Sequence, residues 1–153
     1  MRPASGPRSE IALAWFWVAA WIALVQIFAS GSFAASETSR FIGPLLHWLF
    51  PGADPMSVEG AHFAIRKAAH FVEYAILALL ALRAFHLSFE RPLAGLGAAS
   101  LALALAVAVV DEWRQGVSAD RTGALSDVAL DISGAASALV LAGAFRRFWS
   151  AQA

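Results

Sequence analysis

Four long apolar segments run through the chain, and the stretches between them hold most of its polar residues. They cover residues 11–29, 68–86, 93–110 and 125–145. Each is close to the roughly 20 apolar residues that a helix needs to cross a bilayer. A crossing segment must be helical because the bilayer core holds no water to satisfy its backbone groups. The pattern therefore predicts an all-α polytopic membrane bundle of four transmembrane helices, in a single domain over residues 1–153.

The composition supports a membrane protein. Hydrophobic residues make up 59% of the chain and charged residues 14%, whereas soluble domains average about 45–50% and about 25%. This balance excludes a soluble enzyme, a disordered tail and a nucleic-acid-binding protein. The chain has no cysteine, so it can form neither a disulfide framework nor a thiolate metal site.

The first apolar segment has a second interpretation, because Arg2 and Arg8 precede it and Ser32-Phe33-Ala34 follow it. A basic start, an apolar core and small residues at the end are typical of a secretory signal peptide. However, the apolar segment has 19 residues, and the apolar core of a signal peptide has about 7–15. The length favours a helix that is retained in the protein.

The connection after the first helix holds a shorter apolar stretch, residues 41–50. It is too short to span a bilayer, so it predicts either an interfacial helix with Trp48 at headgroup depth or a loop packed on the helix ends. Asp54 followed by Pro55 is typical of a helix N-cap with proline at the first helical position. The second transmembrane helix is therefore expected to run from Pro55 to about His86.

Basic residues predict the orientation of the bundle. Arg2 and Arg8 lie close to the first span, and Arg146-Arg147 lie directly after the last one. With both termini in the cytoplasm, the cytoplasmic side carries a net charge of +4 and the outer side −4. Cytoplasmic loops of membrane proteins are enriched in Lys and Arg, so both termini are expected to be cytoplasmic.

Small residues recur four apart in two of the spans. One row contains Ser100, Ala104 and Ala108, and the other runs from Gly134 to Ala142. Such rows allow membrane helices to approach closely, although alanine-rich spans also produce the spacing by chance. Both interpretations stay open from the sequence alone.

Polar residues gather at the outer ends of the last three predicted helices. Charge within a span is costly, and such residues usually face the interior of the bundle and pair there. They predict either a polar site in the outer leaflet, opening outward, or a structural clamp between helices. The candidate binding residues are Lys67, His70, Glu73, Asp111, Glu112, Gln115, Arg121, Asp127 and Asp131.

The residue types in this cluster leave the chemistry open. His70 and Glu73 have a spacing that carboxylate-bridged metal sites use, but only one such pair occurs. The carboxylates would also suit a hard cation. Neither pattern is specific, so no metal or cofactor is predicted. A histidine beside carboxylates can act as a general base or a proton relay, so catalysis is neither assigned nor excluded.

Two blocks of sequence resemble the motifs of the VanZ-like family. The first is Ile65-Arg-Lys-Ala-Ala-His-Phe-Val-Glu-Tyr74, and the second begins at Asp111-Glu112-x-x-Gln115 and continues through Arg121 and Asp127 to Gly134. The family usually has asparagine three residues before this last glycine, where this chain has Asp131. That departure adds a carboxyl group to the cluster, which can carry either a charge or a proton.

The resemblance implies a small protein of the bacterial inner membrane with four or five helices. The family's namesake is associated with low-level resistance to the glycopeptide teicoplanin, but the resemblance implies no established reaction. The leading hypothesis is an envelope protein that binds a polar lipid or a cell-wall-related ligand at its outer face. The alternatives are an intramembrane enzyme acting through His70 and the acidic cluster, and a structural subunit. Membrane lipids are the expected partners, nucleic acid is not, and the sequence does not indicate an oligomeric state.

Overall fold

A computed structural model describes residues 7–28, 35–90, 92–117 and 125–150, with side chains except at residues 35–41, 115–117 and 147–150. Over these residues the fold is all-α, as predicted. The described chain forms five helices: α1 (Arg8–Phe28), α2 (Ala35–Leu49), α3 (Pro55–Ser88), α4 (Leu93–Val117) and α5 (Leu125–Ser150).

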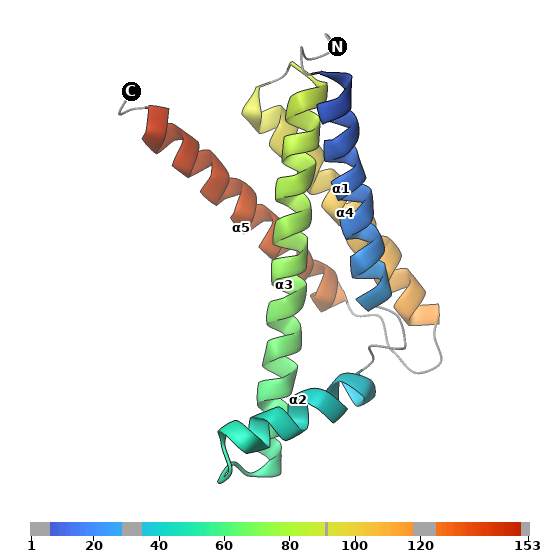
Figure 1. Ribbon diagram of the computed structural model, residues 1–153, viewed down its shortest axis with the longest axis vertical. Coiled ribbons are helices and arrows are strands. Elements are labelled where there is room, and N and C mark those ends of the chain that lie inside the picture. The colour runs from blue at the N-terminus through green and yellow to red at the C-terminus, as the bar shows by residue number, and fades with distance from the viewer. Residues whose placement is uncertain (1–6, 29–34, 91, 118–124, 151–153) are drawn as a thin grey trace.

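Four of the described helices, α1, α3, α4 and α5, are long and apolar enough to cross a membrane. This confirms the predicted four-span, multi-pass architecture. Helices α1 and α4 run in one direction and α3 and α5 in the other, so α1 begins and α5 ends at the same end of the bundle (Figure 1). Helix α3 lies at the centre and contacts each of the other four helices. Helix α5 crosses it obliquely and diverges toward its own C-terminal end (Figure 1).

The core of the bundle is built largely from small side chains. Ala78, Ala81, Ala104 and Ala108 are fully buried where α3 and α4 meet their neighbours. Ser100 is also fully buried, so the row of small residues on α4 faces the bundle, as its spacing allowed. Small side chains let helix backbones approach closely, which is a main source of stability between membrane helices.

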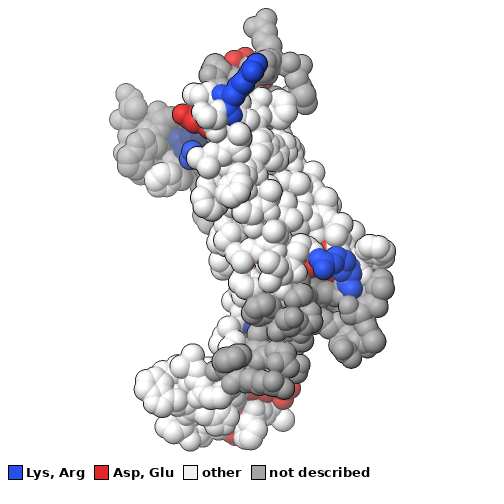
Figure 2. Space-filling model, turned by 45° about the vertical axis from the view of Figure 1, so that its right-hand side comes forward, with Lys and Arg blue, Asp and Glu red and all other residues white. Residues whose placement is uncertain are grey.

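Two tryptophan side chains join α1 to α3. Trp15 Nε1 donates to Ser88 Oγ at 3.0 Å, and Trp21 Nε1 donates to the backbone oxygen of Glu73 at 2.9 Å. Trp17, on the same helix, is exposed. Figure 2 shows a broad band without charged side chains between the charged ends of the face drawn there. Such a band is what a lipid-facing surface requires, because charge is costly in the hydrocarbon core.

The connection between α1 and α3 contains a helix, as one of the two sequence interpretations required. Helix α2 begins at Ala35, earlier than the apolar stretch at 41–50 indicated. It lies across the foot of α3, at the end of the bundle opposite the start of α1 (Figure 1). Leu46 is buried and Trp48 is largely exposed. The location of α2 at headgroup depth stays a prediction.

The N-terminus of α3 is capped as the sequence predicted. Asp54 Oδ1 accepts the backbone N–H of Ser57 at 3.0 Å, and Asp54 Oδ2 accepts the Ser57 hydroxyl at 2.6 Å. Pro55 occupies the first helical position, where its missing N–H costs nothing. The hydrogen bond from the Ser57 side chain, followed by the one from its backbone, holds the pKa of the Asp54 carboxyl below its ordinary value.

The cap predicts a pH-dependent start of α3. Because the folded-state pKa of Asp54 is lowered, its stabilising contribution is present above the unfolded pKa and is lost as the pH falls below about 4. Asp54→Ala should fray the first turn at every pH. Asp54→Asn should keep the cap, since asparagine also caps well, but lose this pH dependence. Hydrogen exchange of the amides at residues 56–59 measures both effects. Equal exchange in all three proteins would contradict the assignment of the cap.

Candidate functional site

Helices α3 and α5 carry matching rows of polar side chains. On α3, Lys67, His70 and Tyr74 share one face, because 3.6 residues make one turn. On α5, Asp127 and Asp131 are one turn apart. The two helices run in the same direction (Figure 1), so the rows can pair in order.

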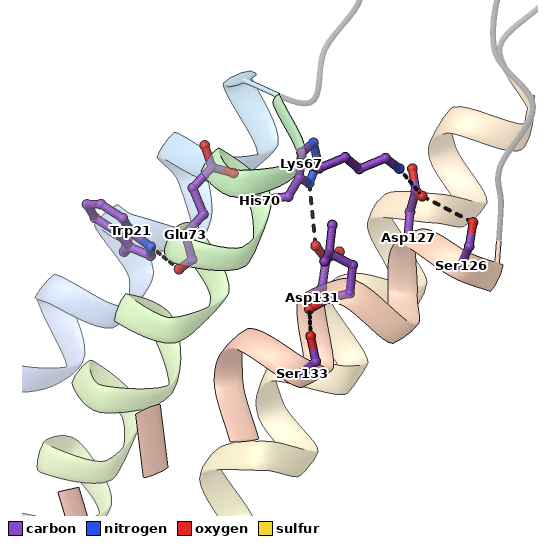
Figure 3. Close-up of polar contacts among 9 residues, drawn as sticks. Trp21, Lys67, His70, Glu73, Ser126, Asp127, Asp131 and Ser133 are labelled. Carbon is purple, nitrogen blue, oxygen red and sulfur yellow. Dashed lines mark hydrogen bonds and ion pairs between the residues drawn. The ribbon is translucent and has the colours of Figure 1, made fainter. Parts of the chain in front are cut away.

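The rows meet in two contacts between the helices. Lys67 Nζ donates to Asp127 Oδ1. One turn further along, His70 Nδ1 lies 3.5 Å from Asp131 Oδ1. Figure 3 shows both side chains of α3 directed toward the aspartates of α5. The structure thus brings together four of the predicted site residues as two pairs.

The exposure of these side chains decreases from the outer pair to the inner one. The side chains of Lys67 and Asp127 are 31% and 29% exposed, that of His70 is 23% exposed, and that of Asp131 is 2% exposed. Tyr74, the next residue of the row on α3, is fully buried. We call the Lys67–Asp127 pair the mouth of the cluster and Asp131 with Tyr74 its floor.

Helix α4 adds carboxylates behind this row. Asp111 is buried and Glu112 is half-buried. Asp111 lies toward the end of α4, and Glu73 follows His70 by three residues on α3. The side chain of Gln115 and the whole of Arg121 lie outside the described part of the chain, and their predicted places in the site stay predictions.

Glu73 is oriented differently from the other acidic residues of the cluster. Its backbone oxygen accepts the Trp21 indole of α1. Figure 3 shows its carboxylate directed away from Asp127 and Asp131, on the side of α3 that faces α1. Glu73 therefore borders the paired rows and is not one of their paired members.

Tyr74 belongs to the cluster, although it was not among the candidate binding residues. Its hydroxyl is buried and has no hydrogen-bond partner among the described residues. The signal that could have identified it is its position one turn after His70, within the same motif block. The ring of Phe63 was also not predicted, and it lies beneath Lys67 with Nζ 5.2 Å from its centroid, in range for a cation–π contact.

The arrangement suits recognition by charge and hydrogen bonds. Within the described chain, no three His, Asp or Glu side chains are grouped as the ligands of a metal ion would be. Instead, a partly exposed ammonium–carboxylate pair lies outside an imidazole, a buried carboxylate and a buried phenol. Such a set can hold a polar group by hydrogen bonds within a low-dielectric surrounding, where they are stronger than in water.

Helices α3 and α5 also make an unusually close backbone contact beside these pairs. A Cβ atom added at Gly134 would lie 2.2 Å from the backbone oxygen of Phe71. Only glycine fits at such a distance, so Gly134 is a true helix contact, as one of the two interpretations of its spacing proposed. Ala138 and Ala142 follow on the diverging part of α5 and are half-buried.

Comparison with known proteins identifies the family. The sequence matches the VanZ/LLP1 family over residues 12–146, which is most of the chain. No match to a curated protein or to a solved structure was found. The matched region contains both motif blocks, the paired rows of α3 and α5, and all of the four spans except the first residues of α1. The chain is a multi-pass membrane protein that belongs to the VanZ/LLP1 family.

Proposed function

We propose that this protein binds the polar part of an envelope lipid or of a cell-wall-related ligand at the outer side of the bacterial inner membrane. The observation that carries the proposal is the graded polar row between α3 and α5. It leads from the partly exposed Lys67–Asp127 pair to the buried Asp131. A mouth of this kind would let a headgroup exchange its hydration for protein contacts.

The cost of the cluster argues for a use beyond packing. An ionisable residue at membrane depth is expensive and is a candidate functional residue by default. Asp111 and Asp131 are both almost fully buried, and apolar residues of similar size would pack there without desolvating a carboxylate. The resemblance to the VanZ-like family adds that such binding could contribute to glycopeptide tolerance.

If the cluster binds lipid, a substitution in it should reduce the amount of lipid retained while the protein still folds. Asp127→Asn keeps the shape of the side chain and an oxygen for Lys67, and its side chain is 29% exposed. Its effect on the free energy of unfolding should therefore stay below about 1 kcal/mol. Native mass spectrometry of protein purified from membranes should show several-fold less bound lipid. Glu59→Gln, an exposed carboxylate at the foot of α3, is the control and should retain lipid as the wild type does.

Retention equal to the wild type in Asp127→Asn would count against the proposal. A new lipid product formed by purified protein would indicate the enzyme instead, and Asp127→Asn and His70→Ala should then abolish its formation.

A structural clamp is the second candidate function. The same two contacts that form the row also join α3 to α5. A clamp requires only that the pairs hold the helices together. Substitutions in the pairs would then reduce any cellular phenotype in proportion to the stability that they remove. Stability and lipid retention therefore have to be measured on the same variants.

The proposed outer location of the site predicts the topology of the chain. The end of α5 and the start of α3 lie at opposite ends of the bundle (Figure 1). A reporter fused after Arg147 should give a cytoplasmic signal, and one inserted within residues 51–57 should give an outer signal. The expected cause is the basic flank of the last span. A cytoplasmic signal from residues 51–57 would place the cluster at the cytoplasmic side and would remove the proposed outer site.

A further inference from the structure

Three buried polar atoms in the cluster lack a hydrogen-bond partner among the described residues. They are His70 Nδ1, Tyr74 Oη and Asp131 Oδ1. Buried polar atoms in folded proteins are nearly always hydrogen-bonded, so each exception needs a physical explanation. Two of the atoms, His70 Nδ1 and Asp131 Oδ1, face each other only as a long ion pair, and the Tyr74 hydroxyl has no hydrogen-bond partner among the described residues. Their place at the inner part of one polar row points to a group from outside the chain.

The three atoms lie in one neighbourhood between α3 and α5. His70 Nδ1 and Asp131 Oδ1 are 3.5 Å apart, too far for a good hydrogen bond but close enough for one small group to contact both. Tyr74 follows His70 by one turn on the same face of α3. Tyr74 and Asp131 are both almost fully buried.

The charge around these atoms favours a cation. Asp131 and Asp111 are almost fully buried carboxylates, and Asp131 Oδ1 lies 3.5 Å from His70 Nδ1. Lys67, the only lysine of the sequence, donates to Asp127. A phosphate or a second carboxylate would bring acceptors and negative charge to a place that already has both.

We propose that His70, Tyr74 and Asp131 bind a primary ammonium group of the ligand. This rests on the proposed function and names the class of ligand as an amine-bearing lipid or cell-wall compound. An ammonium group has three N–H donors, and the carboxylate and phenol oxygens can each accept one. The imidazole Nδ1 accepts the third when the ring is neutral and carries its proton on Nε2.

Lipids that differ only in the headgroup test the inference. The purified full-length protein is given an equal mixture of phosphatidylethanolamine, phosphatidylcholine and phosphatidylglycerol with the same acyl chains, and bound lipid is counted by native mass spectrometry. Phosphatidylcholine keeps the positive charge but has no N–H donor. Phosphatidylethanolamine should be retained about tenfold over either of the others, the size expected for hydrogen bonds to charged groups.

Two variants test whether the preference for phosphatidylethanolamine depends on Asp131 and Tyr74. Asp131→Asn removes the negative charge at nearly constant shape and should reduce the preference for phosphatidylethanolamine over phosphatidylcholine to about one. Tyr74→Phe removes one acceptor and should reduce it several-fold. If Asp131→Asn does not fold, Tyr74→Phe carries the test alone, and Glu59→Gln should keep the full preference.

The outcomes separate this inference from the function on which it rests. Equal retention of phosphatidylethanolamine and phosphatidylcholine would overturn the hydrogen-bonded ammonium, and so would a preference for phosphatidylglycerol. In both cases the proposed lipid-binding function would still be supported if Asp127→Asn retained less lipid than the wild type. No retention of any lipid would overturn both.

Discussion

Replacing Gly134 with alanine is expected to lower the free energy of unfolding by about 3 kcal/mol, the upper end of the usual cost of overpacking. The added Cβ would lie 2.2 Å from the backbone oxygen of Phe71 and 2.9 Å from its carbonyl carbon. A flexible side chain could move aside, but the neighbour here is the backbone of α3 within a helix. The two helices would have to separate, and the nearby His70–Asp131 contact would lengthen with them. Unfolding of the purified protein in detergent measures the loss.

Gly143→Ala on the same helix is the matched control. An added Cβ at Gly143 meets no atom within 4 Å, so the exchange should leave stability unchanged or raise it by up to about 1 kcal/mol through helix propensity. The pair of variants differs only in position along α5. If Gly134→Ala unfolded under the same conditions as Gly143→Ala, the close contact of α3 and α5 would be wrong.

Most of the fold was predictable because a bilayer permits few structures. An apolar stretch of about 20 residues in lipid must be a helix, so hydropathy alone located α1, α3, α4 and α5. The start of α3 was predictable from Asp54 and Pro55, since capping is local chemistry. The first turns of α2 were not, because residues 36–40 are polar and no apolar pattern marks them as helical.

The sequence predicted which residues belong to the polar cluster better than it predicted which of them contact each other. The motif blocks indicated that Lys67, His70, Asp127 and Asp131 would gather at one end of the bundle. Their partners depend on how α3 and α5 are aligned along each other, and the close approach of Gly134 to the Phe71 backbone is one of the contacts that fit this alignment. The row of small residues offered Gly134 as a close helix contact, but neither helix alone identified the backbone of Phe71 as its neighbour.

The orientation of Glu73 shows the same limit. Helical spacing places Glu73 beside His70, but the sequence does not distinguish a carboxylate directed toward α5 from one directed toward α1. The indole of Trp21 bonds to the backbone oxygen of Glu73 and brings α1 against that side of α3. The position of a neighbouring helix therefore separates Glu73 from the paired rows, and residue spacing within α3 does not report it.

Breaking the inner pair is expected to cost about 3 kcal/mol in the free energy of unfolding. His70→Leu keeps a side chain of similar volume but leaves the carboxyl of Asp131, whose side chain is 2% exposed, without its imidazole neighbour. Removing one member of a buried pair is strongly destabilising because the other stays desolvated. Asp131→Leu alone should cost less, because the side chain of His70 is 23% exposed and can turn toward the mouth.

The double variant His70→Leu/Asp131→Leu decides between a clamp and a binding site. Apolar residues can replace a buried pair with little loss, so the double variant should recover most of the stability that His70→Leu loses, with a coupling energy of about 1–3 kcal/mol between the two positions. If the pair serves only to hold α3 against α5, lipid retention and any envelope phenotype should recover together with stability. If the pair binds a ligand, the double variant should be stable and still fail to retain lipid. Chemical unfolding and native mass spectrometry on the same four proteins provide both readouts, and recovery of retention in the double variant would reduce the cluster to a structural clamp.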